Sequence, residues 1–342
     1  MAMKKYEKAV SGNLHVIKNL IQIILYVLIQ IIFIPFAIVG LIDGIYKEMV
    51  ISKKRGVSFS AGQSLQYRWI MHYFDTRPDK LSIEFVKKFP CESHFGLWTI
   101  MGALIISQRY FGFTTKMGRL PDPGKESLDS TAGARVLAFD RIMEKYIDEM
   151  DQIVLLGAGF DLIALNFTEN KNIKVFELDQ SKTLDIKVET LKKAGINHDW
   201  INFVPVDYSR ELWADKLLEA GFDDTKKTLF IWESVSLFLE EEVVKETLRD
   251  MVDLCADGSV VAQDFYSKAF VSGEISSIVR RNSNLIEKMG EPWKFGIDMS
   301  NDPKEAANSF LELCGFKMTD YIQFGEKTDI EPYYCIVEAE KL

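Results

Sequence analysis

Residues 153–161 read Ile-Val-Leu-Leu-Gly-Ala-Gly-Phe-Asp, and this stretch decides the fold class. A short apolar run that ends in glycine is typical of a buried parallel strand followed by a tight turn. Gly157 and Gly159 let the backbone approach a ligand closely, because glycine has no Cβ atom to obstruct it. We therefore predict a strand over 153–156 and a ligand-binding turn after it. A purely structural turn is the alternative.

The same strand-and-turn pattern repeats toward the C-terminus. The expected strands lie at 173–177, 202–206, 228–232 and 259–264, and helices are expected at 131–149, 181–194 and 240–255. Strands that alternate with helices predict a doubly wound, mostly parallel sheet. Two further strand-like runs, 316–324 and 333–338, have no helix between them, which predicts an antiparallel C-terminal edge. The expected fold is therefore α/β and Rossmann-like, with a mostly parallel seven-stranded sheet.

Acidic residues stand where the expected first and second strands end, the edge at which open α/β sheets bind ligands. Asp161 follows the glycine turn; it would repel phosphates and attract a sulfonium or amino group. Leu162 occupies the place of the third glycine in a dinucleotide fingerprint, which disfavours pyrophosphate binding. Glu177 and Asp179 close the second strand, where a carboxylate accepts hydrogen bonds from both ribose hydroxyls. A carboxylate that only favours the following helix dipole is the alternative.

Two later strands end in the same way. Asp207 and Tyr208 follow the third strand, where a carboxylate can meet an adenine amino group, and Glu233 follows the fourth. Any one of these acids alone would be typical of a protein surface. Together with the glycine turn, signals at the ends of four successive strands predict a nucleoside-like ligand.

The N-terminal part carries an apolar run over 20–42 without a formal charge. A helix of about 23 residues is long enough to cross a hydrocarbon core of roughly 30 Å. Only Gln22 and Gln30 interrupt the run, and no signal-peptide cleavage pattern follows it. We expect an N-terminal hydrophobic helix that contacts a membrane through residues 20–42. Pro35 leaves a single span, a re-entrant hairpin and an interfacial helix as alternatives.

Composition limits the partners and the site chemistry. The net charge of −9 and the pI of about 5.2 argue against a nucleic-acid partner. The four cysteines and four histidines have no metal-ligand spacing, so we expect no metal site. A second apolar stretch, 95–107, is too short to span a membrane and predicts a buried helix, with a lid or a second membrane contact as alternatives.

Several strings of the sequence resemble the leucine carboxyl methyltransferase family. They are ARVLAFDRIM, VLLGAGFD, FELDQ, VPVDYS and WESVSLFL, with the weaker landmarks RPDKLSIEF and FGIDMSNDP. The resemblance extends from about Ser60 to the C-terminus. It implies a class I methyltransferase fold, S-adenosylmethionine as cofactor and methyl transfer to an oxygen, often a carboxylate. Together with the apolar N-terminal run, which soluble members of the family lack, it divides the chain into three expected parts: a membrane-associated segment 1–56, a helical cap or substrate region 57–130 and the methyltransferase domain 131–342.

The resemblance also implies roles for individual residues. Arg135 would hold the methionine carboxylate and Glu233 would lie near the methionine amino group. The turn of Gly157, Ala158 and Gly159 would line the cofactor, Asp179 would take the ribose, and Asp207 and Tyr208 would bracket the adenine. The family's usual LGAGLDTRA appears here as LGAGFDLIA, so the arginine of the family pattern is absent at this place. Arg68 is a candidate basic contact to the substrate.

The expected activity is O-methylation of a small, hydrophobic or lipid-like acceptor by a membrane-associated enzyme. A cytosolic cofactor would place the catalytic domain on the cytoplasmic side. Two alternatives stay open: a non-catalytic membrane-anchored scaffold that retains the fold, and an NAD(P)-dependent oxidoreductase. No residue in the sequence identifies itself as a general base, and the oligomeric state is not predicted.

Overall fold

The computed structural model describes the backbone of residues 2–208 and 212–342. Within these residues, seven strands form one sheet in the order β3-β2-β1-β4-β5-β7-β6. The strands are β1 Gln152–Leu156, β2 Lys174–Asp179, β3 Ile201–Pro205, β4 Thr228–Trp232, β5 Val260–Tyr266, β6 Phe316–Gln323 and β7 Tyr334–Lys341. Strands β1 to β5 pair in parallel, and β7 is antiparallel to both β5 and β6. The predicted fold class is confirmed.

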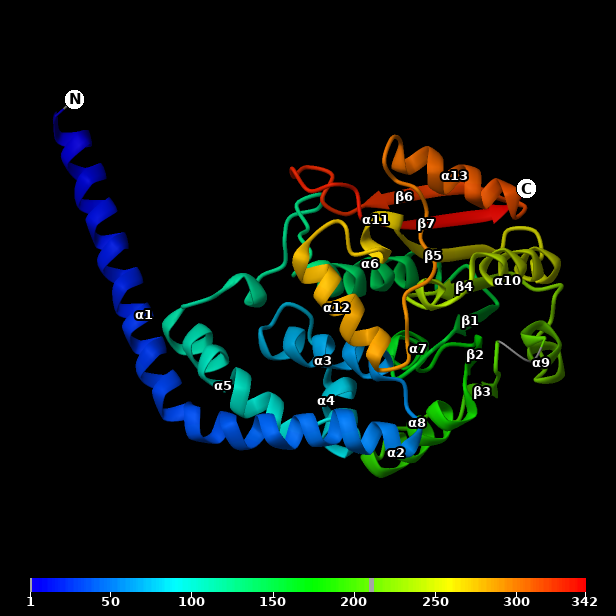
Figure 1. The fold of residues 1–342 in the computed structure, drawn as a ribbon, viewed down its shortest axis with the longest axis horizontal. Helices are drawn as coiled ribbons and strands as arrows, with labels where there is room; N and C mark the ends of the chain where they lie inside the picture. Colours follow the sequence, from blue (N-terminus) through cyan, green and yellow to red (C-terminus); the bar gives the residue numbers. More distant parts are fainter. Residues whose placement is uncertain (1, 209–211) are drawn as a thin grey trace.

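Helices pack on both faces of the sheet (Figure 1). They are α6 Thr131–Tyr146, α7 Ile163–Thr168, α8 Ser181–Ala194, α9 Trp213–Glu219, α10 Glu241–Leu254, α11 Lys268–Val271, α12 Ser277–Lys288 and α13 Pro303–Leu313. The central strands β1 and β4 are buried along their whole length, so their apolar runs are continuous rather than alternating. The chain reverses strand order between β1 and β4, which opens the ligand-binding edge of the sheet there.

A group of helices precedes the sheet: α3 Phe59–Tyr73, α4 Lys80–Lys88 and α5 His94–Phe111. Asp79 caps α4 by accepting a hydrogen bond from the backbone N–H of Ser82 at 3.0 Å. Ser93 caps α5 in the same way, through the N–H of Gly96 at 2.8 Å. Helix α5 buries Ala103, Leu104 and Ile105, as the buried-helix prediction for 95–107 requires.

Helix α1 covers Ala2–Ile45 and contains Pro35. The helical backbone continues through a π-helix, Tyr46–Ile51, into α2, Ser52–Arg55, and ends at the left-handed residue Gly56. Pro35 therefore does not split the segment into two helices. It removes one N–H from the helix ladder, and α1 is bent where it passes α5 (Figure 1). Of the described helices, this one alone is long and apolar enough to cross a membrane.

Candidate functional site

The turn after β1 has the backbone conformation that glycine favours. Gly157 has φ +68° and Gly159 has φ +48°, both in the left-handed region. A Cβ atom on Gly157 would lie 2.4 Å from Cγ2 of Val235, too close for any side chain. A Cβ atom on Gly159 would have Ala61 Cβ, at 3.8 Å, as its nearest neighbour. Packing and backbone conformation therefore both require glycine at position 157, whereas the space beside Gly159 is open.

Asp179 lies against this turn, as the sequence predicted for a carboxylate at the end of β2. Its Oδ2 accepts the N–H of Gly159 at 2.7 Å, and its Oδ1 accepts the N–H of Gln180 at 2.7 Å. Burial raises the pKa of Asp179, while these two backbone hydrogen bonds act in the opposite direction. The N–H of Ala158 donates to the carbonyl of Leu178 at 3.0 Å and ties the turn to β2. The carboxylate and the turn therefore form one rigid unit.

Glu177 is placed differently from Asp179. Its side chain is fully buried and forms an ion pair with Nζ of Lys187, on α8, at 2.5 Å. Lys187 also donates to the carbonyl of Asp161 at 2.6 Å. Burial raises the pKa of Glu177, and Lys187 opposes that shift. Glu177 therefore supports the turn from inside the protein. A contact of Glu177 with the cofactor stays a prediction.

The structure brings Asp161 and Arg68 to each other. Nη2 of Arg68, on α3, donates to Oδ2 of Asp161 at 2.6 Å, and the N–H of Ile163 donates to Oδ1 at 2.7 Å. Arg68 is 0% exposed, and its Nη1 lies 3.7 Å from Asp79. The negative charge of Asp161 is thus already balanced by an arginine of this chain. Ligand contacts by Asp161 and Arg68 stay predictions.

Arg77 extends this ion pair into a buried network that the sequence did not reveal. Its Nη2 donates to Oδ1 of Asp140, on α6, at 2.9 Å, and its Nη1 pairs with Asp79. Burial acts to raise the pKa of Asp79, but Arg77 and Arg68 hold it below its usual value. The quoted strings RPDKLSIEF and ARVLAFDRIM contain these residues. Only the fold shows that they join α3, α4 and α6 to the glycine turn.

At the end of β4, Glu233 pairs with Arg135 of α6. Nε of Arg135 donates to Oε1 of Glu233 at 2.7 Å, and Nη1 donates to Oη of Tyr266 at 3.2 Å. Both charged side chains are 12% exposed. Burial raises the pKa of Glu233 to about 7, although Arg135 opposes the shift. The pair presents one cation and one carboxylate side by side, the two charges that recognise an amino acid group.

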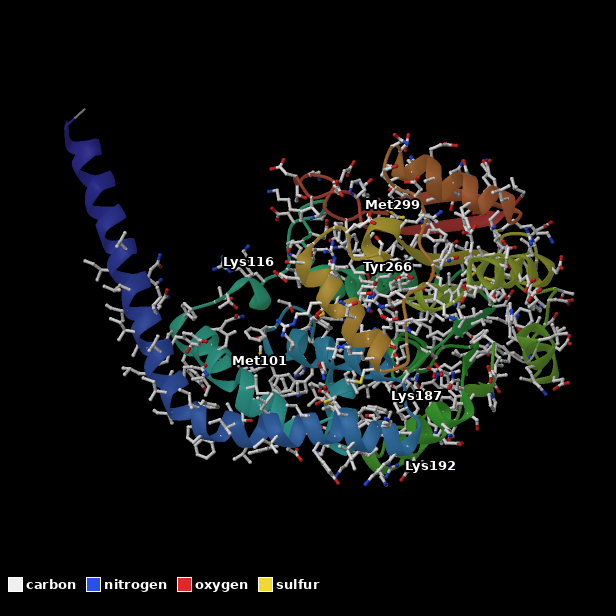
Figure 2. All side chains as sticks on the ribbon, in the orientation of Figure 1. Met101, Lys116, Lys187, Lys192, Tyr266 and Met299 are labelled. Carbon is white, nitrogen blue, oxygen red and sulfur yellow. The ribbon has the colours of Figure 1, made fainter. Side chains whose placement is uncertain are left out.

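Asp264 is a further buried acid beside this pair. The N–H of Ser234, whose φ is +55°, donates to Oδ1 of Asp264 at 2.8 Å. Oη of Tyr334 donates to Oδ2 at 2.8 Å. Asp264 ends the strand predicted at 259–264, so the rule that selected the other acids would also have found it. Lys187 had a signal too, because it stands at helical spacing between apolar Leu184 and Leu191. Figure 2 labels Lys187 and Tyr266 on their elements.

Tyr208 and Asp207 close the site at the end of β3. The N–H of Gly157 donates to Oη of Tyr208 at 3.2 Å, and burial raises the pKa of that hydroxyl. Asp207 lines an open cleft of about 840 Å³ together with Gln180 and Val206. Its lining comes from β3, from the residues that follow β2, and from α8 and α9. The predicted residues thus lie at the ends of β1 to β4 or pair with residues there, and Glu177, Arg68 and Asp161 are engaged in ion pairs within the protein.

A seven-stranded sheet with this strand order and an antiparallel β7 is the class I methyltransferase fold. Residues 107–252 match the model of the family described as leucine carboxyl methyltransferase. This part of the chain is therefore similar to that family, and the resemblance drawn from the sequence motifs is confirmed. The matched range is narrower than the predicted one, which began near Ser60 and extended to the C-terminus.

Curated relatives agree with this relationship. A protein of Mycobacterium ulcerans named "Putative S-adenosyl-L-methionine-dependent methyltransferase" is 29% identical over 173 residues, 49% of this chain and 54% of that protein. The similarly named YktD of Bacillus subtilis is 30% identical over 146 residues, 42% of this chain and 48% of that protein. The chain thus spans about half the length of the curated relatives it matches. A solved DUF574 family protein from Streptomyces avermitilis has a TM-score of 0.46 at 15% identity, covering 63% of this chain and 85% of that one.

Proposed function

We propose that this protein is an S-adenosylmethionine-dependent methyltransferase. The observation that carries the proposal is the carboxylate of Asp179, hydrogen-bonded to the N–H of Gly159 beside an open turn. The Arg135–Glu233 pair at the end of β4 supplies the charges for the other end of the same ligand. The chemistry of these donors and acceptors fits a nucleoside linked to an amino acid. The names of the curated relatives support the same cofactor.

Each residue has a task that follows from its charge and place. Asp179 would accept hydrogen bonds from the ribose hydroxyls, and Asp207 and Tyr208 would flank the adenine. Arg135 would hold the carboxylate of the methionine part, and Glu233 would accept from its ammonium group. When bound, the cofactor supplies an electrophilic methyl group on a sulfonium ion.

The chain contributes position and a dry environment to the reaction. The buried pairs Arg68–Asp161 and Lys187–Glu177 hold the turn from two sides, so the site is organised before any ligand arrives. Holding an acceptor oxygen in line and replacing its water shell lowers the barrier for a displacement at a methyl carbon. A carboxylate acceptor is already ionised at neutral pH and needs no general base.

We further propose that the acceptor is a small or lipid-like molecule methylated on oxygen, and that the catalytic domain faces the cytoplasm. The exposed apolar surface of α1 supports a membrane-resident acceptor, because the helical backbone continues through α2 and ends directly before the cap. Leu162 in place of a third glycine weighs against an oxidoreductase with a dinucleotide cofactor.

A transfer assay tests the proposal. Detergent-solubilised protein would be incubated with methyl-labelled S-adenosylmethionine and either a total lipid extract or a mixture of soluble peptides. We expect label in the lipid fraction, released as volatile methanol by mild base if the acceptor is a carboxylate. Transfer only to peptides would contradict the lipid-like acceptor. Cofactor binding with no transfer to any extract of the source cells would favour the scaffold.

A further inference from the structure

The two amides of the apolar run in helix α1 lie on the side that faces the protein, whereas the exposed side is apolar. The side that faces α5 carries Gln22, whose Nε2 donates to the carbonyl of Phe111 at 2.5 Å. Gly40, also on this side, approaches so closely that a Cβ there would lie 1.9 Å from Oγ1 of Thr99. Gln30, the second amide of the apolar run, is partly buried. Within the apolar run, both amides and Gly40 thus lie toward the protein.

The opposite side of α1 is apolar and uncovered. The exposed fraction is 57% for Ile31 and 64% for Ile42. Further apolar side chains on the same side of α1 are also exposed, namely Ile21, Ile24, Leu28 and Ile38. In water this arrangement is unfavourable, because each exposed aliphatic side chain forgoes the gain of about 1.5–3 kcal/mol from burial. A hydrocarbon medium removes that cost, and it also favours amides that are paired within the protein.

The apolar side continues past the bend of α1 and past the run that the sequence identified. Ile45, Tyr46 and Met49 are exposed as well, and they belong to the part of the helix that leads into α2. In Figure 1 this part lies along the lower edge of the folded domain. A single span needs about 20 residues and would cover only part of this apolar surface. A helix that lies in the plane of one leaflet covers both parts.

Basic side chains stand at the end of this apolar surface. Six exposed ones come from α2 and α8: Lys53, Lys54, Arg55, Lys182, Lys192 and Lys193. Arg55 pairs with Glu189 of α8 at 3.3 Å, so α2 lies beside α8. Asp185 and Glu189 are the exposed carboxylates of α8, so positive charge prevails. Figure 2 shows Lys192 at the same lower edge as α1. This local charge is opposite in sign to the net charge of −9 of the whole chain.

We propose that the outer side of α1, together with the basic group of α2 and α8, is a docking surface for a bilayer with anionic headgroups. The apolar side chains lie in one leaflet, and the lysines and Arg55 contact the headgroups of that leaflet. The helix does not cross the membrane, so both of its ends lie on the side of the catalytic domain. The proposal concerns docking alone and is independent of methyl transfer.

A sidedness experiment tests the topology. The four cysteines are buried, so a single introduced cysteine can be labelled with a membrane-impermeant maleimide. Lys18→Cys lies before the apolar run, and Lys317→Cys, on β6, is a control that reports the side of the catalytic domain. In oriented vesicles from expressing cells, we expect both variants to be labelled from the same side. Labelling of Lys18→Cys only from the opposite side would overturn the proposal in favour of a single span.

A quenching experiment tests contact with the leaflet. Ile24→Cys and Ile42→Cys, one on each side of the bend, would carry an environment-sensitive fluorophore in vesicles that contain lipids spin-labelled in the acyl chain. Both fluorophores should lose fluorescence, whereas one at Lys317→Cys should not. An unquenched fluorophore at Ile42 would show that the later part of α1 lies in water and would refute the proposal.

A third experiment tests whether the docking surface prefers anionic lipid headgroups. A fluorophore at Lys192→Cys should be quenched by headgroup-labelled lipid in phosphatidylcholine vesicles that contain phosphatidylglycerol, and much less in phosphatidylcholine alone. Lys53→Glu/Lys54→Glu should remove the difference, because a basic residue near an anionic surface contributes about a fivefold preference. The paired change Lys226→Glu/Lys227→Glu, outside α2 and α8, is the matched control. Equal quenching in both vesicle types would refute the electrostatic part.

Discussion

The two glycines of the turn differ in a way that can be measured. Both have positive φ, so alanine at either position costs about 1–2 kcal/mol in backbone conformation. Gly157→Ala adds a clash, since its Cβ would lie 2.4 Å from Cγ2 and 3.2 Å from Cγ1 of Val235. Overpacking of this kind costs about 1–3 kcal/mol. Gly159→Ala meets no atom closer than 3.8 Å, so it is the matched control for the clash.

We therefore expect Gly157→Ala to lower the free energy of unfolding by about 2–5 kcal/mol, and Gly159→Ala by about 1–2 kcal/mol. In a Val235→Ala background, the cost of Gly157→Ala should fall toward that of Gly159→Ala. The assay is urea unfolding of detergent-solubilised protein followed by tryptophan fluorescence, with Trp232 buried in the adjacent strand as a reporter. Equal costs for the two glycines, or no coupling between Gly157→Ala and Val235→Ala, would refute the packing argument.

Three further predictions use the charged groups. Arg68→Met should lower the free energy of unfolding by about 3–5 kcal/mol, because it leaves Asp161 buried without its partner. Arg109→Met, at the exposed ion pair with Asp75, is the control and should cost about 0–1 kcal/mol. Burial raises the pKa of Glu233 to about 7 in the folded protein. The contribution of Glu233 to the free energy of unfolding is therefore fully present below the pKa of the unfolded chain, and it is lost as the pH rises through about 7. Glu233→Gln should flatten this part of a pH–stability curve, and an unchanged curve would contradict the prediction. S-adenosylhomocysteine should bind about tenfold more weakly at pH 6 than at pH 8, because its ammonium group requires the ionised form of Glu233, and calorimetry at the two pH values measures the difference.

The fold was largely predictable because it depends on local pattern. The helix at 181–194 and the strand at 228–232 have the predicted ends, since their apolar periodicity stops at a glycine in one case and at a charged residue in the other. The extent of α1 was not predictable. Residues 2–19 and 43–45 lack the apolar run, and their helical state depends on continuation from the neighbouring turns.

The site was predictable only as a set of positions. Strand ends supply the acids, but the partners of these acids come from distant parts of the chain. Arg68 and Asp161 are 93 residues apart, and no local pattern links them. Glu177 and Asp179 share one face of β2 by the two-residue period. Only the packing of Lys187 from α8 shows that Glu177 is engaged inside the protein while Asp179 faces the turn.

The central claim is that Asp179 and the glycine turn hold the nucleoside part of a methyl donor. Calorimetric titration of S-adenosylhomocysteine into the detergent-solubilised protein, its Asp179→Asn variant and the exposed control Asp185→Asn tests it directly. We predict micromolar binding by wild type and control, and a loss of about 1–3 kcal/mol in Asp179→Asn, as expected when a charge-assisted hydrogen bond is removed. No binding by folded wild-type protein, or equal binding by Asp179→Asn, would contradict the account.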